Sequence, residues 1–263
     1  MESKINKIAI LVDGDNAQAK LLKPILEEVS KYGKVTIRRI YGDWTIPQMN
    51  SWKDKLNDLS FNPIQKFSYT TGKNSTDSSL IIDAMDILHD KMVDGFCIVS
   101  SDSDYTGLAK RIREDGVFVM GIGVSTTPNA FVQSCEVFTY CENIAEEIPT
   151  GEQTNKTTQE TKTTPSPKAK KVTTESSQNK VITEKKYPPV DINLINKAYD
   201  MSTNEEEETF IAVIGANLRK INPSFDARTY GFRNLSQLFS SLKEYSVIKH
   251  EVGGFNHPLI KKK

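Results

Sequence analysis

The sequence lacks the features that mark secreted and membrane-spanning proteins. No stretch approaches the roughly 18 to 20 unbroken apolar residues of a membrane span, and residues 1–6 lead directly into a strand-like run, so we expect no signal peptide. The three cysteines (Cys97, Cys135 and Cys141) form no Cys-x-x-Cys pair, and the three histidines form no zinc-spaced cluster. These absences exclude a disulfide scaffold, a membrane protein and a His/Cys zinc enzyme. We expect a reducing, cytoplasmic setting.

Charge is balanced over the whole chain but unevenly distributed. The 263 residues include 34 basic and 34 acidic side chains. Residues 1–150 carry a net charge of −5, residues 151–190 carry +4, and residues 191–263 carry +1. An acidic first block argues against simple binding of phosphates by bulk charge. It is compatible with a carboxylate cluster that needs cations.

Composition divides the chain into three parts. Residues 150–190 are rich in Thr, Lys, Ser, Gln and Pro and poor in large apolar residues. Such a segment cannot bury enough surface to offset the entropy that ordering would cost, so we predict a disordered linker there. We interpret its lysines as part of a solvated tether rather than as polyanion contacts. One folded unit is then expected at residues 1–149 and a smaller one at residues 191–263.

Strand-like and helix-like segments alternate in the first unit. Continuous apolar runs such as Ile8–Val12 and Gly95–Ser100 are typical of buried parallel strands, and Asp77–Lys91 has the apolar spacing of a helix. Further strands are expected at 35–41, 63–69, 117–124 and 137–140, and further helices at 17–32, 48–59, 105–114 and 129–134. Pro24 is expected to break or kink the first of these helices. The alternation predicts an α/β fold with a mainly parallel sheet covered on both faces.

The second unit combines short helices with a final hairpin. Helices are expected at 192–199, 209–217, 225–229 and 235–242, and strands at 247–251 and 256–260. This order predicts a small winged-helix domain.

Acidic residues follow two of the expected strands of the first unit. Asp13 comes after the apolar run 10–12, and Asp102 and Asp104 come after the apolar run 97–99. In an open parallel sheet the ligand site lies beyond the carboxyl ends of the strands. Carboxylates gathered there repel one another unless a cation lies between them, and all-oxygen sites suit Mg²⁺ or Mn²⁺. The sequence therefore predicts a site for one of these metals, which can activate water and neutralise charge on a phosphodiester.

Three further polar residues near the strand ends have two interpretations each. Asp77 opens a helix and is either a third metal ligand or a helix N-cap. Asn16 either orients a metal-bound water or shapes its turn. Lys73 either contacts a phosphate or is an ordinary loop lysine. Two acidic strand ends together with Asp77 favour a metal site over capping alone.

Three short runs of the first unit resemble the signatures of NYN domains, a family of PIN-like nucleases, and the LabA-like branch is the most similar. The runs are Val12–Asn16, Lys73–Asp77 and Ser100–Tyr105, and the resemblance spans about residues 5–145. It implies a PIN-like three-layer α/β/α sandwich whose acidic cleft binds a divalent metal and hydrolyses RNA. By motif position it implies Asp13, Asp77 and Asp102 as the principal metal carboxylates, Asp104 as an assisting one, and Asn16 as an orienting residue. The run before Asp77 departs from the family, which often has Gly-Val there.

Two runs of the second unit, Phe225–Phe232 and Leu235–Phe239, resemble the OST-HTH or LOTUS domain over about residues 192–260. The resemblance implies a small winged helix that binds RNA and, in some members, a protein partner. The candidate contacts with a polyanion are the basic residues Arg219, Lys220, Arg228, Arg233 and Lys243.

The leading hypothesis is an Mg²⁺- or Mn²⁺-dependent ribonuclease whose C-terminal domain recruits RNA or a protein. The first alternative is a haloacid-dehalogenase-like phosphatase with Asp13 as nucleophile, because Asp-x-Asp after a first strand also opens those enzymes. Asn16-Ala17 stands where that family has Thr or Val, which argues against it. The second alternative is a non-catalytic RNA-binding or scaffold protein, which has no need of a like-charge cluster. No membrane partner is expected.

Overall fold

The computed structural model describes residues 5–67, 75–145, 187–203, 208–252 and 255–263. Lys73 and most of the predicted linker lie outside the described residues. Within these ranges, no helix combines the length and the hydropathy that crossing a bilayer requires.

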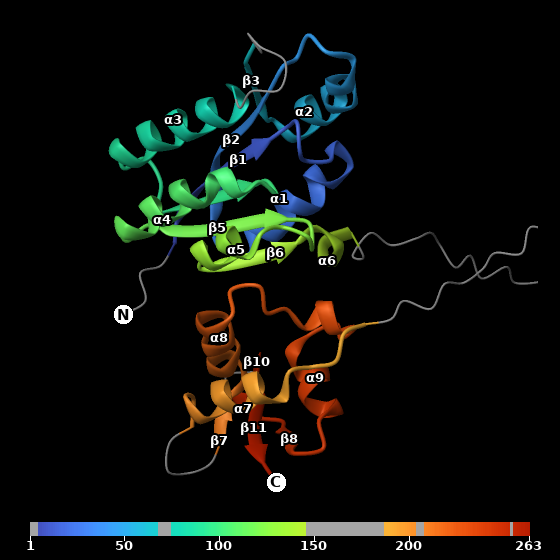
Figure 1. Cartoon of the computed structure of the whole chain (residues 1–263). Coiled ribbons are helices and arrows are strands. Elements are labelled where there is room, and N and C mark those ends of the chain that lie inside the picture. The colour runs from blue at the N-terminus through green and yellow to red at the C-terminus, as the bar shows by residue number, and fades with distance from the viewer. Residues whose placement is uncertain (1–4, 68–74, 146–186, 204–207, 253–254) are drawn as a thin grey trace, which may run out of the picture.

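Six parallel strands form the central sheet of the N-terminal domain (Figure 1). They lie in the order β3-β2-β1-β4-β5-β6. Their bounds are Lys7–Asp13 (β1), Lys34–Gly42 (β2), Asn62–Gln65 (β3), Gly95–Val99 (β4), Phe118–Gly123 (β5) and Val137–Tyr140 (β6). The chain builds outward from β1 to β3 and then, starting from β4, in the opposite direction, so β1 and β4 border the switch point of the sheet. Open α/β sheets bind ligands at such a point, beyond the carboxyl ends of the strands.

Helices cover both faces of the sheet, because successive strand residues point to opposite sides. Ile8, Ile10 and Val12 belong to one core, whereas Ala9 and Leu11 belong to the other. The first core includes residues of α1 (Leu22–Ser30), α2 (Lys53–Leu59) and α6 (Cys141–Ala145); the second includes residues of α3 (Ser75–His89), α4 (Thr106–Glu114) and α5 (Asn129–Ser134). The predicted three-layer α/β/α sandwich is confirmed.

The first two helices begin with 3-10 turns that the sequence pattern did not separate. A turn at Ala19–Leu21 precedes α1, and a longer one at Pro47–Trp52 precedes α2. Pro24 is the third residue of α1. Its missing N–H has no intrahelical acceptor in the first turn. The helix predicted at 17–32 is therefore divided just before Pro24, between the 3-10 turn and α1.

Three helices and a three-stranded antiparallel sheet form the C-terminal domain. The helices are α7 (Ile192–Asp200), α8 (Ile211–Ile221) and α9 (Leu235–Ser241), and a 3-10 turn covers Ala227–Tyr230. The sheet order is β7-β11-β8, with β7 at Glu208–Phe210, β8 at Tyr245–Ile248 and β11 at Leu259–Lys262; β9 (Glu251–Val252) pairs with β10 (Phe255–Asn256). Leu218, Leu238, Phe239 and Ile260 are buried in a separate core. Strand β7 was not expected, and each predicted strand of the hairpin is divided in two.

The C-terminal domain lies against the β6 edge of the central sheet (Figure 1). The backbone N–H of Phe138 in β6 donates to the carbonyl of Pro223 at 2.8 Å. Asn143 Nδ2, in α6, donates to Thr229 Oγ1 at 2.8 Å. Because edge strands expose unpaired backbone groups, this contact satisfies part of the open edge of the N-terminal domain.

Candidate active site

Asp13, the last residue of β1, is completely buried, with 0% of its surface exposed. Its Oδ2 accepts hydrogen bonds from Asn16 Nδ2 at 2.7 Å and from Ser100 Oγ at 2.8 Å. Its Oδ1 accepts the backbone N–H of Asp15 at 3.3 Å. Burial raises the pKa of the Asp13 carboxyl, and the hydrogen bonds from Asn16 and Ser100 oppose that rise only in part. The side chain of Asn16 therefore orients the Asp13 carboxylate through a direct hydrogen bond.

The turn after Asp13 passes so close to β2 that it requires glycine. The Gly14 N–H donates to the Tyr41 carbonyl at 2.8 Å. A Cβ atom at Gly14 would lie 2.7 Å from that carbonyl oxygen and 2.9 Å from Met49 Cε. Because the absence of a side chain lets the backbone approach this closely, Gly14 fixes where the chain leaves β1 and so where Asp13 and Asp15 stand.

The turn after β4 places the next two aspartates. Asp102 caps the 3-10 turn Ser103–Tyr105, and its Oδ1 accepts the N–H of Asp104 at 3.0 Å. The N–H of Asp102 in turn donates to Ser100 Oγ at 3.1 Å. Ser100 therefore links the two strand ends, since its hydroxyl donates to Asp13 and accepts from the Asp102 backbone.

Asp77 lies in the first turn of α3 and faces the end of β4. The Tyr105 hydroxyl donates to Asp77 Oδ1 at 2.6 Å. Burial raises the pKa of Asp77, and the charges of Asp13, Asp102 and Asp104 raise it further, against the lowering effect of the Tyr105 hydrogen bond. Like charges nearby disfavour the ionised form, so each of the three other predicted acids contributes to the raised pKa of Asp77.

Three of the predicted acids form a compact group. Asp77, Asp102 and Asp104 each offer one carboxylate oxygen, and these oxygens all lie within 4.8 Å of one another. Among the described residues Asp13 is not part of that group, although its charge acts on Asp77. An all-carboxylate donor set with mutual repulsion fits a hard divalent cation.

Ser100 and Tyr105 were missed as site residues. Ser100 is buried and Tyr105 is completely buried, and burial together with the charge of Asp13 raises the pKa of the Tyr105 hydroxyl. Both belong to the run that carries the resemblance. The signal that would have found Ser100 is its place directly after a buried strand, where polar residues enter the switch point.

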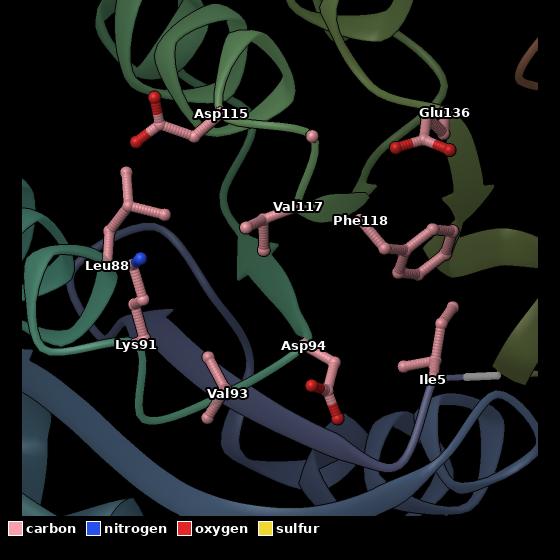
Figure 2. A pocket seen from close by; sticks show the side chains of 10 residues that line it. Ile5, Leu88, Lys91, Val93, Asp94, Asp115, Val117, Phe118 and Glu136 are labelled. Carbon is pink, nitrogen blue, oxygen red and sulfur yellow. The ribbon is translucent and has the colours of Figure 1, made fainter. Parts of the chain in front are cut away.

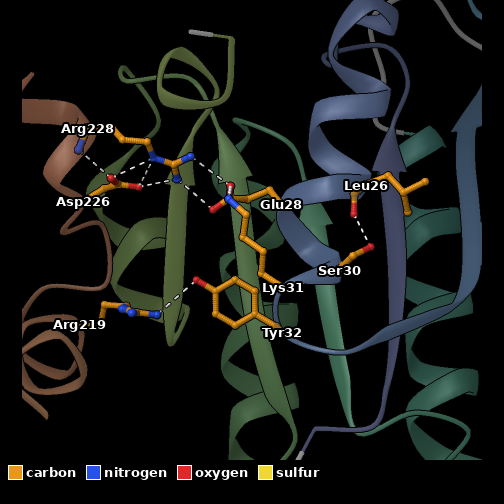
Figure 3. A network of polar contacts seen from close by, with 8 residues as sticks. All are labelled: Leu26, Glu28, Ser30, Lys31, Tyr32, Arg219, Asp226 and Arg228. Carbon is orange, nitrogen blue, oxygen red and sulfur yellow. Dashed lines mark hydrogen bonds and ion pairs between the residues drawn. The ribbon is translucent and has the colours of Figure 1, made fainter. Parts of the chain in front are cut away.

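The basic residues predicted to contact RNA separate into two groups. Lys73 lies outside the described residues. Lys220, Arg233 and Lys243 are exposed on the C-terminal domain. The other two contact the N-terminal domain (Figure 3): Arg219 Nη1 donates to Tyr32 Oη at 3.3 Å, and Arg228 pairs with Glu28.

A cavity of about 820 Å³ lies at the other end of the strands, where β4, β5 and β6 begin (Figure 2). Two of its acidic residues have structural partners. Asp94 Oδ2 accepts the backbone N–H groups of Asn6 and Lys7 at 3.0 and 2.9 Å, and Asp115 pairs with Arg111 across one turn of α4. We therefore place the candidate site at the carboxyl ends of the strands, with the aspartate cluster.

A parallel α/β/α domain with acidic residues at its switch point is a PIN-like, nuclease-type fold. The chain belongs to the NYN domain family, whose profile matches residues 7–145. The profile of the OST-HTH/LOTUS domain matches residues 190–257. NYN domains are part of a nuclease and hydrolase superfamily, and OST-HTH/LOTUS domains are RNA-binding domains.

Individual relatives that resemble this chain carry no printed activity. The chain is 26% identical over 148 residues to the uncharacterized protein MJ0482 of Methanocaldococcus jannaschii, a match that spans 54% of this chain and 57% of that protein. A protein of unknown function from Vibrio parahaemolyticus, VPA0982, is 21% identical, with 53% of this chain and 95% of that one covered and a TM-score of 0.45. An uncharacterized protein from locus NE0665 of Nitrosomonas europaea is 20% identical, with 34% and 89% covered and a TM-score of 0.28. TM-scores this low carry no argument about function.

Proposed function

We propose that this chain is a divalent-metal-dependent ribonuclease. Its N-terminal domain hydrolyses RNA phosphodiesters at the cluster of Asp77, Asp102 and Asp104, with Asp13 beside it, and its C-terminal domain recruits RNA. The observation that carries the proposal is the gathering of three carboxylates within 4.8 Å at the switch point of an NYN domain.

The donor set favours Mg²⁺ or Mn²⁺ as the ion. All three donors are carboxylate oxygens, and these ions prefer oxygen ligands and retain water. Asp77, Asp102 and Asp104 would hold the ion, and Asp13 adds negative charge from the end of β1. When bound, the ion supplies an activated water and neutralises charge on the phosphodiester.

The surrounding side chains orient the carboxylates. Tyr105 fixes one oxygen of Asp77, and Asn16 and Ser100 fix Oδ2 of Asp13. Fixed ligands lower the reorganisation that a reaction would otherwise require. Hydrolysis with departure of the 3′ oxygen leaves a 3′-hydroxyl and a 5′-phosphate.

The environment of Asp13 favours this proposal over a phosphatase. A phosphatase of the haloacid-dehalogenase type needs Asp13 to attack phosphorus directly. Here Asp13 is 0% exposed, and both of its oxygens accept hydrogen bonds. A carboxylate held in this way is suited to positioning and charge, and not to nucleophilic attack.

The experiment that tests the proposal is a cleavage assay on single-stranded and structured RNA with the full chain. We expect cleavage in Mg²⁺ or Mn²⁺, loss of cleavage in EDTA, products with 5′-phosphate ends, and no hydrolysis of p-nitrophenyl phosphate. Full cleavage in EDTA would contradict a metal-dependent site. Hydrolysis of p-nitrophenyl phosphate without RNA cleavage would favour the phosphatase instead.

A further inference from the structure

The guanidinium group of Arg228 is held in one orientation from within the C-terminal domain (Figure 3). Its Nε lies 3.1 and 3.0 Å from the two carboxylate oxygens of Asp226, and its Nη2 lies 2.6 Å from Asp226 Oδ2. The backbone N–H of Arg228 also donates to Asp226 Oδ1 at 2.8 Å. Asp226 thus fixes one edge of the guanidinium and directs the other edge away from its own domain.

That second edge binds the N-terminal domain. Arg228 Nη1 and Nη2 donate to the two oxygens of Glu28 at 3.1 and 2.9 Å, a bidentate pair between residues 200 positions apart. The Glu28 side chain is 5% exposed, and Lys31 Nζ also donates to it at 2.7 Å. Burial alone would raise the pKa of Glu28, but Arg228 and Lys31 reverse that effect and hold it below its ordinary value. Glu28 is therefore a charged ligand of Arg228.

Further polar contacts join the two domains. They include the bonds from Arg219 to Tyr32, from Asn143 to Thr229 and from Phe138 to Pro223. A cavity of about 180 Å³, lined by residues of both domains, remains between them. The buried cores of the two domains have no residue in common. Interfaces between domains of one chain resemble those of transient complexes unless they are large and hydrophobic, so we expect this contact to form and release.

The edge of Arg228 that Glu28 occupies fits a second kind of ligand. A guanidinium edge binds carboxylate and phosphate with the same bidentate geometry. The bonds that orient that edge come from Asp226 in the C-terminal domain itself and do not involve Glu28. One edge binds one anion at a time, so a phosphate and Glu28 compete for it.

We propose that Arg228 is an anion site with two alternative ligands, the carboxylate of Glu28 and a phosphodiester group of RNA. Docking of the C-terminal domain on β6 and RNA binding at Arg228 then exclude each other. The inference rests on the RNA-recruiting role proposed above for the C-terminal domain. By linkage, docking lowers the apparent affinity for RNA, and RNA releases the domain from the sheet edge by the same factor.

The amide of Phe138 reports docking directly. Its N–H donates to Pro223 in the other domain, whereas the N–H of Glu136 donates to Val119 within the N-terminal domain at 2.9 Å and serves as the internal reference. Hydrogen exchange of both amides is measured in the full chain in EDTA, with and without a mixture of random-sequence oligoribonucleotides. We expect RNA to accelerate exchange at Phe138 and to leave Glu136 unchanged. Unchanged exchange at Phe138 when RNA is saturating would overturn the proposal.

Two substitutions separate docking from RNA binding. Glu28→Gln removes the competing anion, so we expect fast exchange at Phe138 without RNA and RNA affinity raised about fivefold or more. Arg228→Lys replaces the guanidinium, which can bind an anion through two N–H groups, with a single ammonium. We therefore expect equally fast exchange at Phe138 but RNA affinity below that of Glu28→Gln. Glu27→Gln is the matched control, because Glu27 is 64% exposed on the same helix and pairs with Lys23.

Three further results would overturn the inference. The first is unchanged or weaker RNA binding by Glu28→Gln, provided that its circular dichroism matches that of the parent. The second is equal RNA affinity in Glu28→Gln and Arg228→Lys. The third is protection of Phe138 that disappears on dilution, because docking would then occur between two chains. None of these measurements requires cleavage, so a failed nuclease assay leaves the inference standing, and failure of the inference leaves the aspartate cluster untouched.

Discussion

Asp77, in the acidic cluster, and Glu28, at the contact between the domains, are carboxylates whose neighbours carry opposite charge. Burial is the largest single influence on both carboxyls, and by itself it raises both pKa values. Around Glu28, Arg228 and Lys31 reverse the shift and lower the pKa. Around Asp77, the other aspartates add to it and raise the pKa. Burial therefore does not distinguish the two sites, and the charge of their neighbours does.

This difference separates a carboxylate that is paired within the folded chain from one that we propose binds a cation. Glu28 has its cation in the folded chain, so its charge stabilises the contact between the domains. The charges of Asp13, Asp102 and Asp104 raise the cost of ionising Asp77, and a cation bound there would lower that cost. Perturbation of a carboxyl by burial together with like charges is typical of functional sites. The comparison predicts that substitutions at the two sites will have opposite consequences.

The largest expected effect is on cleavage. Asp102→Asn removes one carboxylate of the cluster and should lower the cleavage rate about a thousandfold, because a metal site contributes several kcal/mol to catalysis. Asp86→Asn is the control, since Asp86 is exposed on α3, the helix that carries Asp77. Single-turnover rates on one RNA check the pair. Near-parental cleavage by Asp102→Asn would show that the aspartate cluster is not the site of cleavage.

The next effect is on stability. Mn²⁺ at about one hundred times its dissociation constant should raise the free energy of unfolding by about 2.7 kcal/mol, because it binds the folded state. Thermal denaturation with Mn²⁺ and with EDTA measures this gain. Asp77→Asn should lose most of it, whereas Glu28→Gln should keep it. An equal gain in the parent and in Asp77→Asn would place the metal elsewhere.

The arrangement of the acidic strand ends was predictable because its causes are local. Apolar runs such as Ile8–Val12 indicate buried strands, and a parallel sheet brings their carboxyl ends to one rim. Ser100 accordingly bonds to both Asp13 and the Asp102 backbone, and carboxylate oxygens of Asp77 and Asp102 lie within 4.8 Å of each other.

The finer division of the site was not predictable, because it depends on contacts between distant residues. Asp13 is held by Ser100, which is 87 positions away, and no local pattern encodes that bond. In the same way Arg228 was visible only as a basic residue of a winged helix. Its partner Glu28 lies on α1, 200 positions earlier in the chain, so no local pattern encodes that pair either. Strand β7 likewise exists through its pairing with β11.

A smaller effect concerns the backbone that positions Asp13. Gly14→Ala would place a Cβ 2.7 Å from the Tyr41 carbonyl, which cannot move without shifting β2, so we expect a loss of about 1 to 3 kcal/mol. Gly107→Ala is the control, because a Cβ there meets nothing within 4 Å and alanine favours the helix by about 0.5 to 1 kcal/mol. Chemical denaturation measures both. Equal stability of the two variants would show that the turn has room to adjust.

The smallest expected effect is the opposite response of the two sites to acid. The folded-state pKa of Glu28 lies below its ordinary value of 4.5, so its stabilising contribution is present above that value and is lost as the pH falls through the lowered pKa. The folded-state pKa of Asp77 lies above its ordinary value of 3.8, so it costs stability at neutral pH in EDTA, and acid relieves that cost.

Two variants isolate these signs. In the parent, exchange at Phe138 should become faster as the pH falls relative to the Glu136 reference, because protonated Glu28 no longer pairs with Arg228 and Lys31. Glu28→Gln should already be undocked at neutral pH, so its Phe138 exchange relative to that reference should not change with acid. Asp77→Asn in EDTA should be more stable than the parent at neutral pH by about 1 kcal/mol or less, and the difference should vanish toward pH values below the ordinary pKa of aspartate. If both variants shifted stability in the same direction at neutral pH, neighbouring charge would not be what separates the two sites. If only the Asp77 effect were missing, the aspartates would already be neutralised within the folded chain, and the case for a cation there would rest on cleavage alone.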